Sequence, residues 1–241
     1  VSSDITVQNG SLNNFSGSGD EYSFTVTPEN NGLITINILE NVAETAFGNG
    51  NLAANYTIVF DNSGPSIVLS SSETSPTHSS SFAIDIEANE TIFNFEQSDL
   101  TIENASVTGF SGSDTLYNLT VSPTTDGNVS VLIAEGVVND LAGNGNSASN
   151  TLNIYYDNLP PVIAIDAIEE IGTLETISFS WQASDNSIID DHVISITHDG
   201  QNYSIIDTIS GSFSSLDWTV PNLISSQNQI IVLSTDEWGL S

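Results

Sequence analysis

The stretch "LAGNGNSASNTLNIYYDNLPP", Leu141–Pro161, is the most informative part of the sequence, because a near copy, "AFGNGNLAANYTIVFDNSGP", occupies Ala46–Pro65. Both copies contain a glycine–asparagine turn, a run of alternating apolar and polar residues, an Asp-Asn pair and a proline. Alternation with a period of two predicts a half-buried strand, and glycine, asparagine and proline mark the turns at its ends. The proline fixes φ, so it predicts a defined joint with the segment that follows.

The two copies belong to a longer tandem repeat. Phe15 and Phe110 lie 95 positions apart, as do Tyr22 and Tyr117, and one inserted residue makes the spacing of Pro65 and Pro161 96. A period of this length approaches the size of a β-sandwich domain, about 100 residues. Chance similarity does not produce a register maintained over so many positions.

Strand patterns continue along the whole chain, and no window keeps a helical period. We therefore predict an all-β fold of tandem β-sandwich domains in a linear array. The expected domains are residues 1–63, in which the opening strands are missing, a complete repeat at 64–159, and a sandwich of a second type at 160–241 without its last strand. These boundaries suggest a piece of a longer array, or a chain whose missing strands another chain supplies.

The charge balance excludes several classes of function. The chain has no lysine or arginine, 31 acidic residues and a formal net charge of −31. Without cations it cannot neutralise phosphates, so we expect neither nucleic-acid binding nor attachment to anionic membranes. No apolar run reaches the roughly 18 residues that would predict membrane insertion. Cysteine is absent, which excludes disulfides and thiolate metal sites.

Calcium is the cofactor that this composition favours, because hard cations bind oxygen ligands. The turn "NDLAGNGN" offers Asp140 and Asn144, to which we add the linker residue Asp157, with Glu90 from the opposing loop as a fourth ligand. Asp61 occupies the corresponding linker of the first copy. Turn chemistry alone also selects asparagine and glycine at such positions, so the structural interpretation stays open.

Other polar and aromatic residues give weaker indications. Asp185, Asp190, Asp191 and Asp236 are a second acidic group that could share a site. The three histidines, His78, His192 and His198, have no metal-binding spacing, so we expect surface or turn roles for them. Trp181 is expected in the core, while Trp218 and Trp238 could serve either the core or ligand stacking. No motif places a nucleophile or a carboxylate pair for catalysis, so we do not expect an enzyme.

The segments "SDLTIENASVTGFSGSDTLYNLTVSP" (Ser98–Pro123) and "GNVSVLIAEGVVNDLAGNGNSASNTLNIYYDNLPP" (Gly127–Pro161) resemble the bacterial immunoglobulin-like (Big-type) repeats of large secreted adhesins and surface proteins. The resemblance covers about residues 1–160. The last third resembles a related module through "SWQASD" at Ser180–Asp185 and "WTVP" at Trp218–Pro221. Family members usually contain some lysine and arginine, and this chain departs from them in having neither.

The resemblance implies tandem immunoglobulin-like β-sandwich domains, with an immunoglobulin- or fibronectin-like sandwich of a second type at 160–241. It also implies an extracellular, cell-surface rod without catalytic activity. We accordingly expect a spacer or stalk segment of a bacterial adhesin or surface filament, stiffened by calcium. Its partners would be neighbouring immunoglobulin-like domains of the same or an adjacent chain, with any host or surface glycan or protein bound by regions outside it. The alternative is a self-assembling filament or sheath subunit that exchanges strands between chains. The third hypothesis is a carbohydrate-binding module that uses Trp218 or Trp238.

Overall fold

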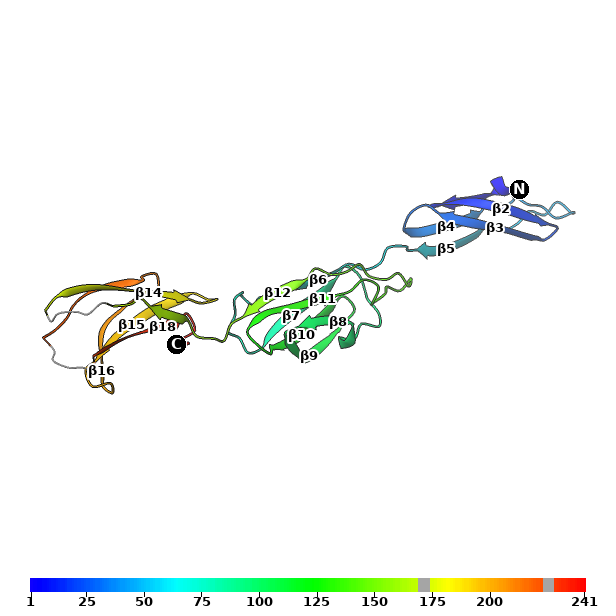
Figure 1. The fold of residues 1–241 in the computed structure, drawn as a ribbon. Coiled ribbons are helices and arrows are strands. Elements are labelled where there is room, and N and C mark those ends of the chain that lie inside the picture. The colour runs from blue at the N-terminus through cyan, green and yellow to red at the C-terminus, as the bar shows by residue number, and fades with distance from the viewer. Residues whose placement is uncertain (169–173, 223–227) are drawn as a thin grey trace.

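A computed structural model describes residues 1–168, 174–222 and 228–241. The strands form three separate units that follow one another end to end, so that the molecule is elongated (Figure 1). Unit 1 holds β1–β5, unit 2 holds β6–β12 and unit 3 holds β13–β18. The prediction of an all-β fold of tandem sandwiches is confirmed. No helix in the described part of the chain is long and apolar enough to cross a membrane.

Unit 2 is a seven-stranded sandwich of two antiparallel sheets. One sheet has the order β6-β7-β10-β9 and the other the order β12-β11-β8, which is the arrangement of an immunoglobulin constant-type domain. Its strands are β6 (Ile67–Ser70), β7 (Phe82–Ala88), β8 (Leu100–Glu103), β9 (Ala105–Ser113), β10 (Leu116–Pro123), β11 (Gly127–Ile133) and β12 (Leu152–Tyr156).

The core of unit 2 follows from the alternation in its strands. In β7 every second residue is buried, from Phe82 to Ala88, and these side chains pack against Leu119 and Val121 of β10. Val129, Val131 and Ile133 of β11 cover them from the other sheet. Since side chains in a strand point alternately to opposite faces, one apolar stripe per strand is enough to fill the space between the sheets.

Unit 1 repeats the later strands of this plan. Its sheets have the orders β1-β4-β5 and β2-β3, and they correspond to β8-β11-β12 and β9-β10 of unit 2. The strands are β1 (Ile5–Gln8), β2 (Gly10–Ser18), β3 (Glu21–Pro28), β4 (Gly32–Ile38) and β5 (Ala54–Phe60). Ile34 is its one buried apolar side chain among the described residues. No described strand takes the places that β6 and β7 hold in unit 2.

Unit 3 is a second type of sandwich, with sheets β13-β14-β17 and β16-β15-β18. Its strands are β13 (Val162–Ile165), β14 (Thr176–Ser184), β15 (Ile189–Thr197), β16 (Tyr203–Ser210), β17 (Ser215–Thr219) and β18 (Gln229–Asp236). Trp181 lies in the core, as the sequence predicts, beside Phe179 and Ile194. The expectation for His192 is wrong: it is buried, edge-on to Trp181, and shares a hydrogen bond with Ser234. Alternation along β15 turns His192 inward together with Ile194.

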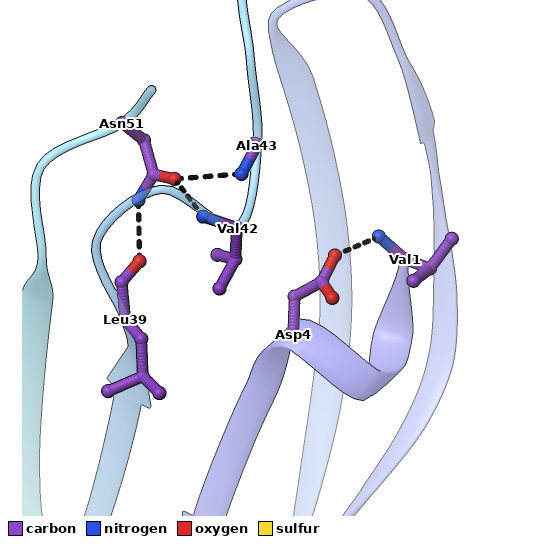
Figure 2. A network of polar contacts seen from close by, with 6 residues as sticks. All are labelled: Val1, Asp4, Leu39, Val42, Ala43 and Asn51. Atoms are coloured by element: carbon purple, nitrogen blue, oxygen red, sulfur yellow. Dashed lines mark hydrogen bonds and ion pairs between the residues drawn. The ribbon is translucent and has the colours of Figure 1, made fainter.

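One asparagine in each repeat organises the glycine–asparagine turn. In unit 1 the Oδ1 atom of Asn51 accepts hydrogen bonds from the amides of Val42 and Ala43, and its Nδ2 donates to the carbonyl of Leu39 (Figure 2). Asn146, 95 positions on, makes the equivalent bonds inside unit 2 and is buried. The turn therefore recurs partly for structural reasons, because this side chain satisfies backbone groups that no strand partner reaches.

Candidate metal centre

Three carboxylates converge where unit 1 joins unit 2. Asp61 follows β5, Glu90 lies in the loop after β7, and Asp140 lies in the turn after β11. One carboxylate oxygen from each lies within 4.8 Å of the others. We call these three residues the acidic cluster. In the described part of the chain it is the only group of three or more histidine or acidic residues this close together.

The turn after β11 fixes the position of Asp140. The backbone amide of Asn144 donates to Oδ1 of Asp140 at 2.8 Å, and its Nδ2 donates to Oδ2 at 2.8 Å. Burial of Asp140 would by itself raise its pKa, but hydrogen bonds from Asn144, Gly143 and Ala142 outweigh burial and lower it. The carboxylate is thus held ionised and oriented by the loop itself.

The same turn holds the linker that joins the two units, residues 61–66. The Nδ2 atom of Asn144 reaches the carbonyls of Asp61 and Ser63, at 3.3 and 3.4 Å. Gly64 lies so close to the turn that a Cβ there would fall 1.8 Å from the carbonyl oxygen of Gly145. The amide of Ser147 donates to the carbonyl of Pro65 at 3.0 Å. The linker is therefore packed against unit 2 and hydrogen-bonded to it, and only glycine fits at position 64.

The electrostatics of the acidic cluster favour a bound cation. Burial raises the pKa of Glu90, and the nearby charges of Asp61 and Asp140 raise it further. The chain has no lysine or arginine to offset this repulsion. Carboxylate oxygens, with the linker carbonyls of Asp61 and Ser63 close by, form the hard donor set that calcium prefers. The side chain of Asn144, which the sequence also suggested as a ligand, turns its nitrogen and not its oxygen toward Asp140 and these carbonyls. The residues present therefore fit calcium, which Asp61, Glu90 and Asp140 would hold.

Asp157 does not join the acidic cluster, although the sequence analysis grouped it with Asp140. It follows Tyr156 of β12, which pairs with Gly127 at the start of β11, whereas Asp140 comes after the end of β11. The two residues therefore lie at opposite ends of the sheet. Asp61 holds the position in the first repeat that Asp157 holds in the second, so each aspartate belongs to the joint that follows its own repeat.

At the joint between units 2 and 3, Asp157 meets Asp185 from the loop after β14. Asp157 is fully buried, and its Oδ2 has no hydrogen-bond partner. Burial raises the pKa of Asp157; the amide of Leu159 opposes this, and the carboxylate of Asp185 raises the pKa further. Asp157 and Asp185 line one hollow between the units with Pro160 and Val162. Two carboxylates from neighbouring units thus face each other across this joint.

The second acidic group expected from the sequence does not assemble. Asp185 contacts Asp157, while the Oδ1 atom of Asp236 accepts the amides of Trp238 and Leu240, both at 2.9 Å, within its own turn. That turn brings Trp238 onto His78 of unit 2, where the rings stack 5.6 Å apart. Nδ1 of His78 lies 3.3 Å from the carbonyl oxygen of Asp157. No pattern in the sequence indicated this contact, because its partners lie in different units.

Comparison with known proteins agrees with the fold of the middle unit. Residues 61–156 match the family model described as a bacterial Ig-like domain. Among solved structures, Yersinia pseudotuberculosis InvD is similar over 98% of this chain and 75% of its own, with 12% identity and a TM-score of 0.34. The comparison with curated proteins gave no match. The expected family resemblance is thus confirmed for the second repeat: residues 61–156 are similar to a bacterial Ig-like domain.

Proposed function

We propose that the chain is a non-catalytic, extracellular spacer in a bacterial surface protein of the adhesin type. The observation that supports this most is the joint between units 1 and 2, where the linker is hydrogen-bonded to the turn of unit 2 and Gly64 packs on Gly145. A flexible linker would not need contacts that hold it against unit 2. Units joined in this way transmit position and force along the chain, which is the task of a stalk.

Calcium is proposed as the ion that stiffens this joint. Asp61 belongs to the linker, whereas Glu90 and Asp140 belong to two loops of unit 2. An ion bound to all three would tie the linker to the unit and remove the repulsion among them. The surplus of acidic residues then has two uses, since it supplies ligands and keeps a long surface protein soluble.

The contacts give less support to the two other hypotheses, a carbohydrate-binding module and a strand-exchanging filament. A carbohydrate platform would need an accessible aromatic face, but Trp218 packs against the core of unit 3 and Trp238 stacks on His78. A filament formed by exchanging strands would have to withdraw β6 and β7 from unit 2, where their inward side chains are buried. The spacer needs no such rearrangement.

Small-angle X-ray scattering of the full chain tests the spacer directly. We expect a maximum dimension close to the summed length of three sandwich units, independent of protein concentration, at an ionic strength that screens the surface charge. A compact particle, or a dimension that shrinks as salt rises, would show that the units fold back on one another. Either result would contradict the proposal.

A further inference from the structure

The joint between units 2 and 3 contains buried carboxylate oxygens that lack partners. Asp157 is fully buried, and its Oδ2 has no hydrogen-bond partner among the described residues. The Oδ2 atom of Asp126 is buried and unpartnered in the same sense. Both aspartates lie at the end of the β11–β12 pair where Gly127 is opposite Tyr156. Buried polar atoms are almost always satisfied, so two such oxygens at one strand end indicate a ligand between the units.

The first repeat shows how the same position is satisfied without a second carboxylate. Asn31 is the equivalent of Asp126, 95 positions earlier, and its Nδ2 donates to Oδ1 of Asp61 at 2.6 Å. In each repeat the Oδ1 atom of this residue also accepts a backbone amide of the following linker at 3.0 Å. An ionised carboxylate keeps that second contact but cannot donate to Asp157 as the amide donates to Asp61. The second joint has thus exchanged a hydrogen-bond donor for a negative charge.

Unit 3 brings a third carboxylate to the same place. Asp185 lies in the loop after β14, where the backbone amide of Ser187 donates to its Oδ1 at 2.8 Å and so fixes its orientation. Burial raises the pKa of Asp157, and the carboxylate of Asp185 raises it further. The two aspartates line a hollow of about 210 Å³ together with Pro160 and Val162. Since a water molecule takes about 30 Å³, this hollow has room for an ion with several waters.

We propose that the joint between units 2 and 3 holds a divalent cation of the calcium type, bound by Asp157 and Asp185 with Asp126 behind them. The ion binds Oδ2 of Asp157, since Oδ1 already accepts the amide of Leu159 at 3.2 Å. Calcium takes about six to eight oxygen ligands, waters included, so water completes the shell inside the hollow. The acidic cluster ties a linker to unit 2, whereas this ion connects the end of unit 2 directly to a loop of unit 3.

A shared proton is the other way to hold two facing carboxylates together. One proton between Asp157 and Asp185 removes a single negative charge and leaves Oδ2 of Asp126 without a partner. A divalent cation offsets two charges and attracts all three carboxylates. The cation therefore accounts for both unpartnered oxygens, and the proton accounts for one.

A tryptophan next to the hollow makes the site observable. Trp238 stacks on His78, whose Nδ1 lies 3.3 Å from the carbonyl oxygen of Asp157. All three tryptophans of the chain belong to unit 3. Terbium(III) binds the same oxygen ligands as calcium and luminesces when an excited tryptophan lies close to it. The acidic cluster lies at the other end of unit 2, so terbium bound there is far from every tryptophan (Figure 1).

The test is titration of the full chain with terbium at neutral pH, under excitation selective for tryptophan. We expect saturable luminescence that calcium reverses by competition. Asp185→Asn should weaken terbium binding by about a hundredfold and Asp126→Asn by about tenfold, since even outer-shell partners contribute about 10- to 100-fold to metal affinity. Asp217→Asn removes an exposed carboxylate beside Trp218 on β17, and this matched control should bind terbium as the parent does.

Glu90→Gln separates this site from the acidic cluster, on which it does not depend. This variant should leave the tryptophan-sensitised luminescence unchanged, because Glu90 belongs to the other joint, so either site can fail without the other. Luminescence that Asp217→Asn lowers as much as Asp185→Asn would mean loosely held surface ions and would overturn the proposal. So would an absence of saturable binding, or an unfolding midpoint of unit 3 that rises on acidification but not with calcium, which would assign the pair to a shared proton.

Discussion

Millimolar calcium is expected to raise the unfolding midpoint of unit 2 in the full chain by about 10 °C or more over its value in excess chelator. A ligand that binds only the folded state at about 100 times its dissociation constant adds about 2.7 kcal/mol to the stability. For a unit of this size, 1 kcal/mol shifts the midpoint by about 4–8 °C. Differential scanning calorimetry at matched ionic strength measures the shift.

The variant Glu90→Gln separates a bound ion from general charge screening. In chelator it should be slightly more stable than the parent, because one of three mutually repelling carboxylates is gone. In calcium it should be less stable than the parent, because a ligand is gone. Glu103→Gln, which removes an exposed carboxylate of β8, is the matched control and should show no such reversal. An equal calcium shift in the parent and in Glu90→Gln would contradict the site.

In the absence of calcium, protonation of Glu90 should partly relieve the repulsion within the acidic cluster and so stabilise unit 2. The pKa of Glu90 is raised in the folded state by burial and by Asp61 and Asp140, so the folded chain binds this proton more tightly than the unfolded chain. The contribution of this group to stability therefore grows as the pH falls through the raised value and is lost as the pH rises through it. In Glu90→Gln this contribution should be absent.

Replacing Asn146 by alanine is expected to lower the stability of unit 2 by about 2–4 kcal/mol, since buried backbone groups lose their partners. Its Oδ1 accepts the amides of Val137 and Val138, at 2.9 and 3.0 Å, and its Nδ2 donates to Ala134 and Ser147. Alanine offers none of these bonds. Urea unfolding followed by far-ultraviolet circular dichroism measures the change. Tryptophan fluorescence reports unit 3 alone, because all three tryptophans lie there, and it serves as the internal reference.

Asn153→Ala is the matched control for this asparagine. Asn153 is exposed on β12, and its Oδ1 accepts a hydrogen bond from Nδ2 of Asn128 at 2.8 Å. Its replacement should stay within about 0.5 kcal/mol of the parent. A cost for Asn146→Ala no larger than that of the control would show that the turn folds without its asparagine, and that its recurrence has another cause.

The sequence predicted the strands and the core of the repeats well, because both depend on local alternation. Phe82, Ile84 and Ile86, which occupy every second position of one strand, are all buried, and Trp181 lies in the core of unit 3 as expected. The 95-residue register also placed Asn51 and Asn146 at equivalent turns. Patterns of this kind depend only on residues that are close in the sequence, so a single sequence is enough to predict them.

Contacts between units could not be predicted in the same way. Asp157 and Asp140 are closer in sequence than Asp61 and Asp140, yet the strand direction of β11 and β12 places Asp157 at the far joint. The stacking of Trp238 on His78 likewise depends on how two sandwiches meet. His192 was misjudged because a histidine among charged residues resembles a surface residue, while its register in β15 turns it inward.

The distance between spin labels on either side of the joint between units 1 and 2 shows whether calcium stiffens this joint. The chain has no cysteine, so Thr57→Cys on β5 and Thr101→Cys on β8, both exposed, accept labels without side reactions. Calcium should give a narrow distance distribution that broadens in chelator, and Gly64→Ala should broaden it under both conditions by forcing the linker from Gly145. A distribution of the same width with and without calcium would contradict a calcium-stiffened spacer.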